Sequence, residues 1–359
     1  MKKKRIAIVI LGLLLLIAAI VAWKYYEMRH LRFVENMGAG INIGNSLDST
    51  RLEEYEEGAS VKDYEVSWGN PEISEELFQA IRDAGFSTVR IPVTWDEHID
   101  EDGNISEDWI SRVQEVVDMA LAQDLYVILD THHEEWLDLQ VEKEDEIIEN
   151  FRKIWLQIAN RFRFYDEKLL FEGMNEPRLR DSEDEWTAGT EEMQALVNRL
   201  NEVFIETVRS TGEGNEDRYL LICPYANRYE YDALKALEVP KGNIIVSIHF
   251  YSPHDFCQEE DGTAEWSRQD TESVEKIENT FGDMNSLFVQ KGVPVIITEF
   301  ACRDKDNIEN RMEWLQLYME QAEENDIGYI WWDNGSDYRL LDRETCEVVY
   351  PELVEELVK

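Results

Sequence analysis

Residues 169–177 read Leu-Leu-Phe-Glu-Gly-Met-Asn-Glu-Pro, a short apolar run that stops abruptly at Asn175 and Glu176. Residues 294–300 read Pro-Val-Ile-Ile-Thr-Glu-Phe and repeat the pattern, with Glu299 near the end of the run. Continuous rather than alternating apolarity is typical of a strand that is buried on both faces, as in a parallel sheet. A carboxylate where such a strand ends does not serve an apolar core, so Glu176 and Glu299 are candidates for a chemical function.

Runs of the same kind recur along the chain, at 39–43, 88–93, 125–130, 169–174, 219–223, 244–251, 294–300 and 328–332. Helical periodicity lies between several of them, at 77–84, 109–120, 147–158, 193–204 and 312–322, and Pro351 suits the first turn of a last helix. Strands that alternate with helices in this way predict an α/β fold, a single-domain (β/α)8 TIM barrel over residues 36–359. A doubly wound open sheet is the alternative, but no G-x-G-x-x-G follows the first run.

The N-terminus has the pattern of an export signal. Four basic residues at positions 2–5 precede an uncharged apolar run at 6–22, and aromatic residues follow at 23, 25 and 26. The run is just long enough to span a bilayer, and aromatic side chains are typical of the membrane interface. We expect residues 1–23 to be a signal anchor, with a cleaved signal peptide as the alternative, and residues 24–35 to be a short juxtamembrane linker. The domain beyond would then lie outside the cytoplasm, membrane-anchored or secreted.

Composition narrows the partners. The chain has 359 residues, 43% of them hydrophobic, and a formal charge of −42. So acidic a chain lacks the basic patch that nucleic acid binding needs, and its charge predicts a well-solvated, monomeric protein. The cysteines include no C-x-x-C pair, so a zinc ribbon or a redox pair has no support. Two disulfides are permitted, but free thiols are the simpler expectation for Cys223, Cys257, Cys302 and Cys346.

Polar residues gather where the predicted strands end, and in a barrel these ends meet at one face. Each run except the fifth contributes some of the following: Asn42, Asn45, Arg90, Trp95, Asp130, Thr131, His132, His133, Asn175, Glu176, His249, Tyr251, Glu299, Trp331, Trp332, Asp333 and Asn334. Packing alone does not explain such a set, because buried charges are costly unless they are paired.

Two carboxylates with aromatic and imidazole neighbours suit glycoside hydrolysis. One carboxylic acid protonates the leaving oxygen, and the second carboxylate attacks the sugar or activates water. Indole rings stack on the apolar faces of sugars, while amides and imidazoles bind the hydroxyls. A metal site is the rival interpretation, but His132, His133 and Glu134 are adjacent rather than spaced as in H-E-x-x-H. A metal held by distant residues stays open as an alternative.

These motifs resemble glycoside hydrolase family 5. The resemblance rests on Asn-Glu-Pro at 175–177, Glu299, Val-Arg-Ile-Pro-Val-Thr-Trp at 89–95 and His-Phe-Tyr at 249–251. Gly-Ile-Asn-Ile-Gly-Asn-Ser-Leu-Asp at 40–48, Trp-Gly-Asn-Pro at 68–71 and Trp-Asp-Asn-Gly at 332–335 are similar to its subfamily 4. The resemblance covers about residues 33–336 and implies a TIM barrel with endo-β-1,4-glucanase, lichenase or xyloglucanase activity and no cofactor or metal.

The resemblance also implies the catalytic roles. Glu176 would be the general acid/base, with Asn175 bound to the sugar 2-hydroxyl. Glu299 would be the nucleophile, kept ionised by Arg90 and Tyr251. The two carboxyl groups of a retaining enzyme lie about 5 Å apart, and we expect the ionised nucleophile to raise the pKa of the acid so that the acid holds the proton.

Further residues are implied as substrate contacts. His132 and His249 would line the subsite at the cleaved bond, with His133 as an alternative to His132. Trp332 would be the stacking platform, and Asn45 would flank the cleft. A polysaccharide or oligosaccharide is the expected partner, with the membrane contacted only through the N-terminal segment.

The chain departs from the family pattern at several positions. Ile41 and Ile43 stand where Trp and Leu are usual, Ser46 where Thr is usual and Thr298 where Gly is common, and 224–228 is a less typical sequence. No departure removes a catalytic atom, so they bear on substrate preference. A β-mannan or other β-glycan hydrolase, a non-catalytic glycan-binding barrel and a metal-dependent barrel hydrolase are the alternatives.

Overall fold

The protein forms a closed barrel of parallel strands. The computed structural model describes residues 28–50 and 59–359. The strands are β1 (Gly40–Asn42), β2 (Thr88–Ile91), β3 (Tyr126–Leu129), β4 (Leu169–Glu172), β5 (Leu220–Ile222), β6 (Ile244–His249), β7 (Val295–Phe300) and β8 (Gly328–Trp331). Each strand pairs with the next, and β8 pairs back with β1, so the expected TIM barrel is confirmed and the open sheet is wrong. Most strands end before the apolar run does, because the last residues of the run already belong to the loop that follows.

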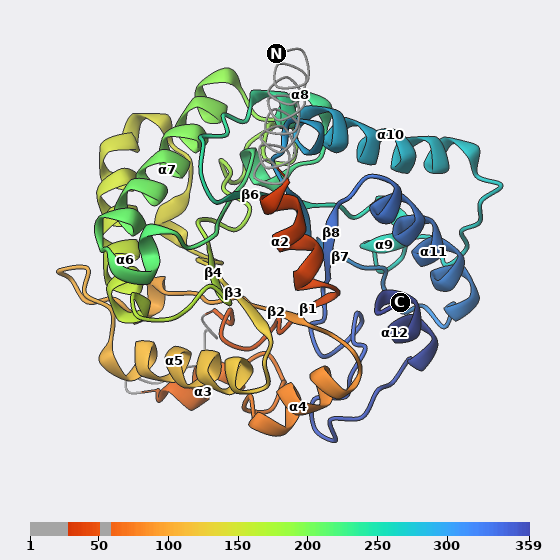
Figure 1. Cartoon of the computed structure of the whole chain (residues 1–359), viewed down its shortest axis with the longest axis horizontal. Coiled ribbons are helices and arrows are strands. Elements are labelled where there is room, and N and C mark those ends of the chain that lie inside the picture. The colour runs from red at the N-terminus through yellow and green to blue at the C-terminus, as the bar shows by residue number, and fades with distance from the viewer. Residues whose placement is uncertain (1–27, 51–58) are drawn as a thin grey trace, which may run out of the picture.

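Helices surround the barrel (Figure 1). They are α2 (Arg29–Met37), α3 (Val61–Glu65), α4 (Glu75–Asp83), α5 (Glu107–Ala122), α6 (Glu144–Phe162), α7 (Glu191–Ser210), α8 (Tyr231–Ala236), α9 (His254–Cys257), α10 (Thr271–Leu287), α11 (Ile308–Glu324) and α12 (Pro351–Leu357). The helices expected from periodicity are all present. The sequence interpretation missed α10, whose core face is Ile277, Phe281 and Met284 and whose first turn is capped by Asp270.

The barrel interior is layered by the two-residue period of the strands. Near the N-terminal ends of the strands the inward positions are aliphatic, and they form a cluster separate from the outer core: Ile128, Leu170, Leu221, Ile245, Ile296 and Ile330. Two residues further along most of these strands the inward positions are polar and fully buried, among them Asp130, Glu172, Ser247 and Thr298. The polar layer therefore lies directly beneath the ends of the strands, where the candidate residues stand.

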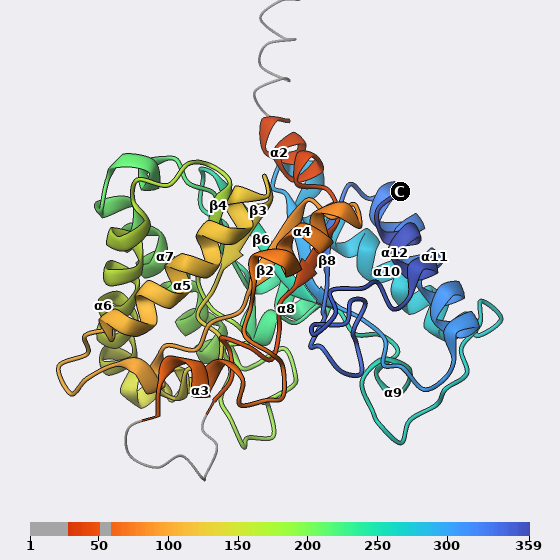
Figure 2. The same cartoon turned by 90° about the horizontal axis from the view of Figure 1, so that it is seen from below.

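Helix α2 closes the N-terminal end of the barrel. Its Val34 and Met37 pack on the aliphatic layer, and the ring of Phe33 stacks on Tyr219 with centroids 3.7 Å apart. Part of the segment that we expected as a linker is therefore helical. Figure 2 shows α2 on one side of the barrel, with α3 and α9 on the other, where the loops after the strands lie.

The signal-anchor prediction lies outside the described residues, since it concerns residues 1–23 and the description begins at residue 28. Within residues 28–50 and 59–359, no helix is long and apolar enough to cross a membrane. The acidic loop at 48–68 is also described only in part, and it contains the short helix α3. The four cysteines are free, as the sequence suggested, and three of them are buried.

Candidate active site

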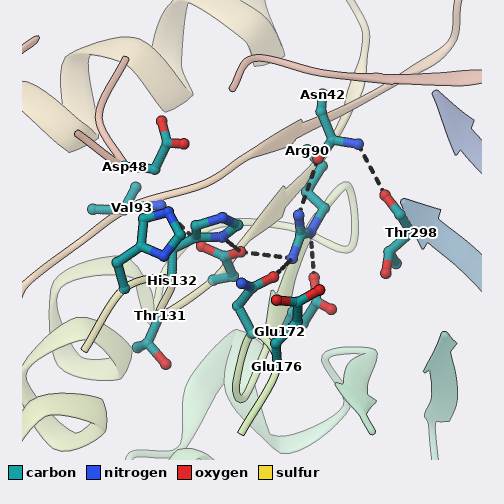
Figure 3. Close-up of polar contacts among 12 residues, drawn as sticks. Asn42, Asp48, Arg90, Val93, Thr131, His132, Glu172, Glu176 and Thr298 are labelled. Carbon is teal, nitrogen blue, oxygen red and sulfur yellow. Dashed lines mark hydrogen bonds and ion pairs between the residues drawn. The ribbon is translucent and has the colours of Figure 1, made fainter. Parts of the chain in front are cut away.

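Arg90 is the centre of the buried polar layer. Its guanidinium donates to the Glu172 carboxylate at 2.6 Å and to Glu299 at 2.7 Å, and it forms an ion pair with Asp130 at 2.8 Å. Figure 3 shows Arg90 with Asn42 and Glu172 beside it. Burial by itself lowers the pKa of Arg90, but the charges of the three carboxylates outweigh it and raise that pKa. The single guanidinium therefore pairs with three carboxylates. This pairing offsets the cost of burying the four charged side chains.

Arg90 also orients the neutral side chains. It donates to the side-chain oxygens of Asn42, at 3.1 Å, and Asn175, at 2.9 Å. The amide nitrogen of Asn42 in turn donates to the backbone oxygen of Thr298 at 2.9 Å (Figure 3). With its oxygen used by Arg90, Asn175 has its amide NH2 left for another partner.

The histidine doublet follows β3 and lies beside Asp130, which also pairs with Arg90. His132 Nδ1 is 2.8 Å from Asp130, so Nδ1 carries the hydrogen and Nε2 is left as the free nitrogen. Burial lowers the pKa of His132 well below its usual value and the pKa of His133 to about 4, so both imidazoles are neutral. The carboxylate of Glu134 does not join the histidines, because it accepts a hydrogen bond from the backbone N–H of Trp95 at 2.8 Å.

Glu299 reaches the site through an irregularity in strand pairing. Ile296 and Thr298 point into the barrel, so strict alternation would turn Glu299 outward. The register between β6 and β7 shifts after Ile248, and His249 pairs with Glu299 instead of Thr298. Such a bulge re-aims a side chain, and here it leaves Thr298 as the extra residue. Both Thr298 and Glu299 therefore make contacts inside the barrel.

Glu176 reaches the same place through an unusual backbone. Its φ is +45°, in the left-handed region, and its backbone nitrogen donates to Asn227 Oδ1 at 2.7 Å. A non-glycine residue in this conformation is strained by about 1–3 kcal/mol, and such residues gather at functional sites. Its carboxylate meets His249 Nδ1 at 3.0 Å.

The two glutamates and His249 form one cluster. Carboxylate oxygens of Glu176 and Glu299 lie within 4.8 Å of each other and of a His249 ring nitrogen. Tyr251 Oη donates to Glu299 at 3.2 Å, and the second Glu299 oxygen is held by Arg90. The separation matches the roughly 5 Å of retaining glycosidases and is shorter than the ~6.5–9.5 Å of inverting ones.

The proton in this cluster is placed differently from our expectation. Burial raises the pKa of Glu299, and Glu176 adds to that rise against the charges of His249 and Arg90. Burial also favours a raised pKa for Glu176, but the hydrogen bond and charge of His249, with the charge of Arg178, lower it to about 2. The pKa of His249 is raised because its two acidic neighbours outweigh its burial. The directions of these three pKa shifts favour the proton on His249 rather than on Glu176, across the 3.0 Å hydrogen bond between them.

Trp332 lies against the histidines. Its ring is parallel to that of His132, with centroids 5.8 Å apart. A side chain at Gly44 would approach the Trp332 ring to 2.7 Å, which explains the glycine in the opening motif. Asn70 donates to the backbone oxygens of Asn45, at 2.8 Å, and Asn334, at 3.1 Å, and so joins the loops after β1 and β8.

A cavity of about 660 Å³ opens beside Glu176. It is lined by Glu176, Trp186, Arg228, His249, Tyr251 and His254, among others. The Trp186 ring is 49% exposed and is covered on one face by Arg178, 4.1 Å from the ring centroid. Trp68, 36% exposed, has its ring centroid 5.7 Å from that of His133. Partly exposed indole rings therefore lie near both Glu176 and the histidine doublet.

The structure brings the predicted site residues together and adds others. Asn45 is part of the loop beside Trp332, through its backbone contact with Asn70. The sequence interpretation missed Glu172 and Trp186. An acid inside a run buried on both faces requires a cation, so Glu172 could have been paired with Arg90. Trp186 is an isolated indole in an acidic loop, a signal that is easily taken as chance.

Within residues 28–50 and 59–359, two groups of side chains could hold a metal ion. One consists of Asp48, His132 and His133, and the other of Glu176, His249 and Glu299; in each, ligand atoms lie within 4.8 Å of one another. In the second group the pKa of His249 is raised, so its imidazole tends to hold a proton, and a protonated imidazole does not bind a metal cation.

Comparisons with known proteins agree with the geometry. The model of the family "Cellulase (glycosyl hydrolase family 5)" matches residues 52–338. Endoglucanase 1 of Ruminococcus albus is 39% identical over 333 residues, which are 90% of this chain and 79% of that protein. XEG5A, a GH5 xyloglucan-specific endo-β-1,4-glucanase from a metagenomic library, solved in complex with cellotriose, is 37% identical with a TM-score of 0.87, over 92% of this chain and 99% of that one.

A further solved structure is similar over the same region. The GH5-4 broad specificity endoglucanase of Ruminococcus champanellensis, with bound cellotriose, is 35% identical with a TM-score of 0.87, over 92% of this chain and 98% of that one. Sequence, fold and site geometry thus agree, and the chain belongs to glycosyl hydrolase family 5, as a glycosidase that hydrolyses O-glycosyl bonds.

Proposed function

We propose that the protein is a retaining endo-β-1,4-glucanase of the subfamily 4 type, acting on cellulose-type glucan, mixed-linkage β-glucan or xyloglucan. The observation that carries the mechanism is the approach of the Glu176 and Glu299 carboxylates to within 4.8 Å. That separation has room for a sugar between a nucleophile and an acid, but not for the extra water of an inverting enzyme. The endoglucanases of similar sequence support the substrate class.

Glu299 is the nucleophile of the proposed reaction. One oxygen is held by Arg90 at 2.7 Å and the other accepts from Tyr251 at 3.2 Å, so the carboxylate is fixed in position. It attacks the anomeric carbon while Glu176 passes the proton that it receives from His249 to the glycosidic oxygen, and the bond to the leaving sugar breaks. The glycosyl ester on Glu299 is then hydrolysed, with Glu176 accepting a proton from the attacking water.

Neighbouring residues bind the sugar at the cleavage point. The NH2 of Asn175 and the free Nε2 of His132 are available to hydroxyls, and Trp332 offers a parallel ring beside them. His249 Nε2 is buried and has no hydrogen-bond partner among the described residues, which suits a contact with substrate. Because Glu176 protonates the leaving oxygen, the cavity with Trp186 lies on the side of the departing sugars.

The proton shared by Glu176 and His249 predicts a pH effect. The active form needs one proton on this pair, and the pair loses it with a pKa raised above the usual 6.5 of histidine. In His249→Asn the only proton donor is the Glu176 carboxyl, which releases its proton at lower pH. We expect the basic limb of the kcat/KM profile to move to lower pH by roughly one unit or more. Profiles of both proteins on a soluble glucan measure this, and an unchanged basic limb would show that His249 does not share the proton.

An activity panel tests the function itself. We expect reducing ends to be released from carboxymethyl cellulose, mixed-linkage β-glucan or xyloglucan, with a rapid fall in viscosity that marks endo action. Release from β-mannan alone would identify the alternative substrate, and no release from any soluble β-glycan would favour a binding protein. Activity should persist in excess chelator, since the proposed steps use carboxylates and no metal; loss that is restored by a divalent cation would support the metal-dependent alternative.

We also propose that the protein acts outside the cytoplasm as a monomer, tethered by the apolar segment at 6–22 or released from it. The position of α2 supports this arrangement, because α2 lies at the end of the barrel opposite the face that carries the site (Figure 2). Fractionation of the producing cells, with mass measurement of the mature N-terminus, separates an anchored from a cleaved form. Recovery of the intact chain from the cytoplasm alone would contradict the proposal.

A further inference from the structure

The fifth strand has no residue in the expected reaction, although its loop contacts the acid. Two successive non-glycine residues of this loop, Ala226 and Asn227, have a left-handed backbone with φ of +50° each. Ala226 donates its backbone N–H to Pro177 at 2.9 Å, and Asn227 Oδ1 accepts the N–H of Glu176 at 2.7 Å. The loop after β5 therefore holds the turn after β4 in which Glu176 stands, and strain in both turns indicates that the contact is selected for position.

The contact continues across the barrel. Asn227 Nδ2 donates to Ser247 Oγ on β6 at 3.0 Å, and Ser247 Oγ lies 2.7 Å from Thr298 Oγ1 on β7. All three side chains are fully buried. Ser247 gives its own hydrogen to Glu172, which as a carboxylate only accepts, so the hydrogen between the two hydroxyls comes from Thr298. Asn227, Ser247 and Thr298 thus form a line of hydrogen bonds in which the donor and the acceptor of each bond are defined.

The line ends at the bulge that turns Glu299 into the barrel. Thr298 is the extra residue there, and its hydroxyl is bound to the neighbouring strand next to the point where the register shifts. The two elements that aim the proposed catalytic pair, the left-handed turn at Glu176 and the bulge before Glu299, are thus connected through three side chains.

We propose that Asn227, Ser247 and Thr298 are positioning residues that set the placement of Glu176 relative to Glu299. They touch neither the sugar nor the reacting atoms. The proposal rests on the function assigned above, and it gives the fifth strand a part in the reaction. Because the acid stands on the strained turn, it is the partner whose placement depends most on this line, and misplacement by about 1 Å costs up to ~100-fold in rate.

The leaving group of the substrate separates positioning of the acid from a general loss of structure. Hydrolysis of glucan needs the proton from Glu176, whereas dinitrophenyl β-cellobioside releases an acidic phenol that departs without it. For Asn227→Gly we expect kcat/KM on glucan to fall about 10–100-fold and kcat/KM on the dinitrophenyl substrate to change less than about 3-fold. Glycine suits the positive φ, so the backbone is not strained by the change. Ala226→Gly is the matched control for added flexibility and should have a much smaller effect on glucan.

Thr298 provides the test at the other end of the line. Thr298→Val keeps the shape and removes the hydroxyl, so it should show the same preference for the activated substrate, while Thr298→Ser should retain wild-type behaviour. Thr88→Val is the matched control, since Thr88 is also buried and bonded, to the Met37 carbonyl at 2.6 Å, at the far end of the barrel. It should change stability and leave both rates unchanged.

A comparison of the double variant with the single variants tests whether the residues act as one unit. The combination of Asn227→Gly and Thr298→Val should be no slower than the slower single variant, because each breaks the same line. Multiplying effects, an equal loss on both substrates, or wild-type rates in Asn227→Gly would overturn the proposal. A wild-type rate in Asn227→Gly beside an inactive Glu176→Gln would remove the positioning role alone, while an active Glu176→Gln would remove the function on which it rests.

Discussion

Glu299→Gln is expected to lower kcat on soluble glucan by about 10⁴-fold or more, with the fold intact. An amide at this position does not form the glycosyl ester, so the two-step route is lost and only weak direct hydrolysis is left. The substitution removes one of three carboxylates around a single cation, and Arg90 keeps Asp130 and Glu172. We therefore expect the thermal midpoint to be maintained or raised.

The measurement is reducing-sugar release together with a thermal unfolding curve. Glu324→Gln, an exposed acid at the end of α11, is the matched control and should leave rate and stability unchanged. A Glu299→Ala variant supplied with azide should yield a glycosyl azide of inverted configuration, because azide then attacks from the side of the missing carboxylate. Full glucanase activity in Glu299→Gln would remove the nucleophile assignment.

Glu176→Gln should lower kcat on glucan by about 10²–10⁴-fold, the usual contribution of a general acid and base. The effect depends on the leaving group. On dinitrophenyl β-cellobioside the first step should stay fast and the second should become limiting, since no base activates water; a burst of phenol followed by slow turnover is the expected trace. Azide should restore turnover in Glu176→Ala and give a product of retained configuration, opposite to that from Glu299→Ala.

The two azide products identify which carboxylate stands on which face of the sugar. The same configuration from both variants would contradict the double displacement, even if both substitutions abolish activity. A Glu176→Gln variant that hydrolyses glucan at the wild-type rate would show that another group supplies the proton. His249 is the neighbour that could do so, since it lies 3.0 Å from Glu176 and has a raised pKa.

Much of the fold could be predicted because a strand buried on both faces has a recognisable sequence pattern. Each strand of a barrel is covered by helices outside and by layers of side chains inside, so its residues are apolar without alternation. Helix α10 escaped notice because its apolar positions, such as Ile277 and Phe281, are diluted by polar residues. The fourth strand also contains Glu172, which an apolar pattern does not predict; its burial depends on Arg90, far away in sequence.

The prediction that failed was a raised pKa for Glu176 that would keep the proton on that acid. From two carboxylates alone, the repulsion between their charges puts the proton on the acid. The structure adds His249 at 3.0 Å from Glu176 and at 3.5 Å from Glu299, and its charge lowers the pKa of Glu176 to about 2. The order of such pKa values follows distances between side chains on different strands, and those distances are absent from a motif.

The sequence by itself determined the barrel, the face at which polar residues gather and the candidates Glu176, Glu299 and Arg90, because strand ends and residue types are local properties. Only the tertiary structure decided how the glutamates meet. Glu299 is turned inward by a register shift against β6, and Glu176 by a left-handed turn that Asn227 holds. Both depend on pairing between segments distant in the chain, and hydrogen bonds across a closed barrel form only when all eight strands are in place.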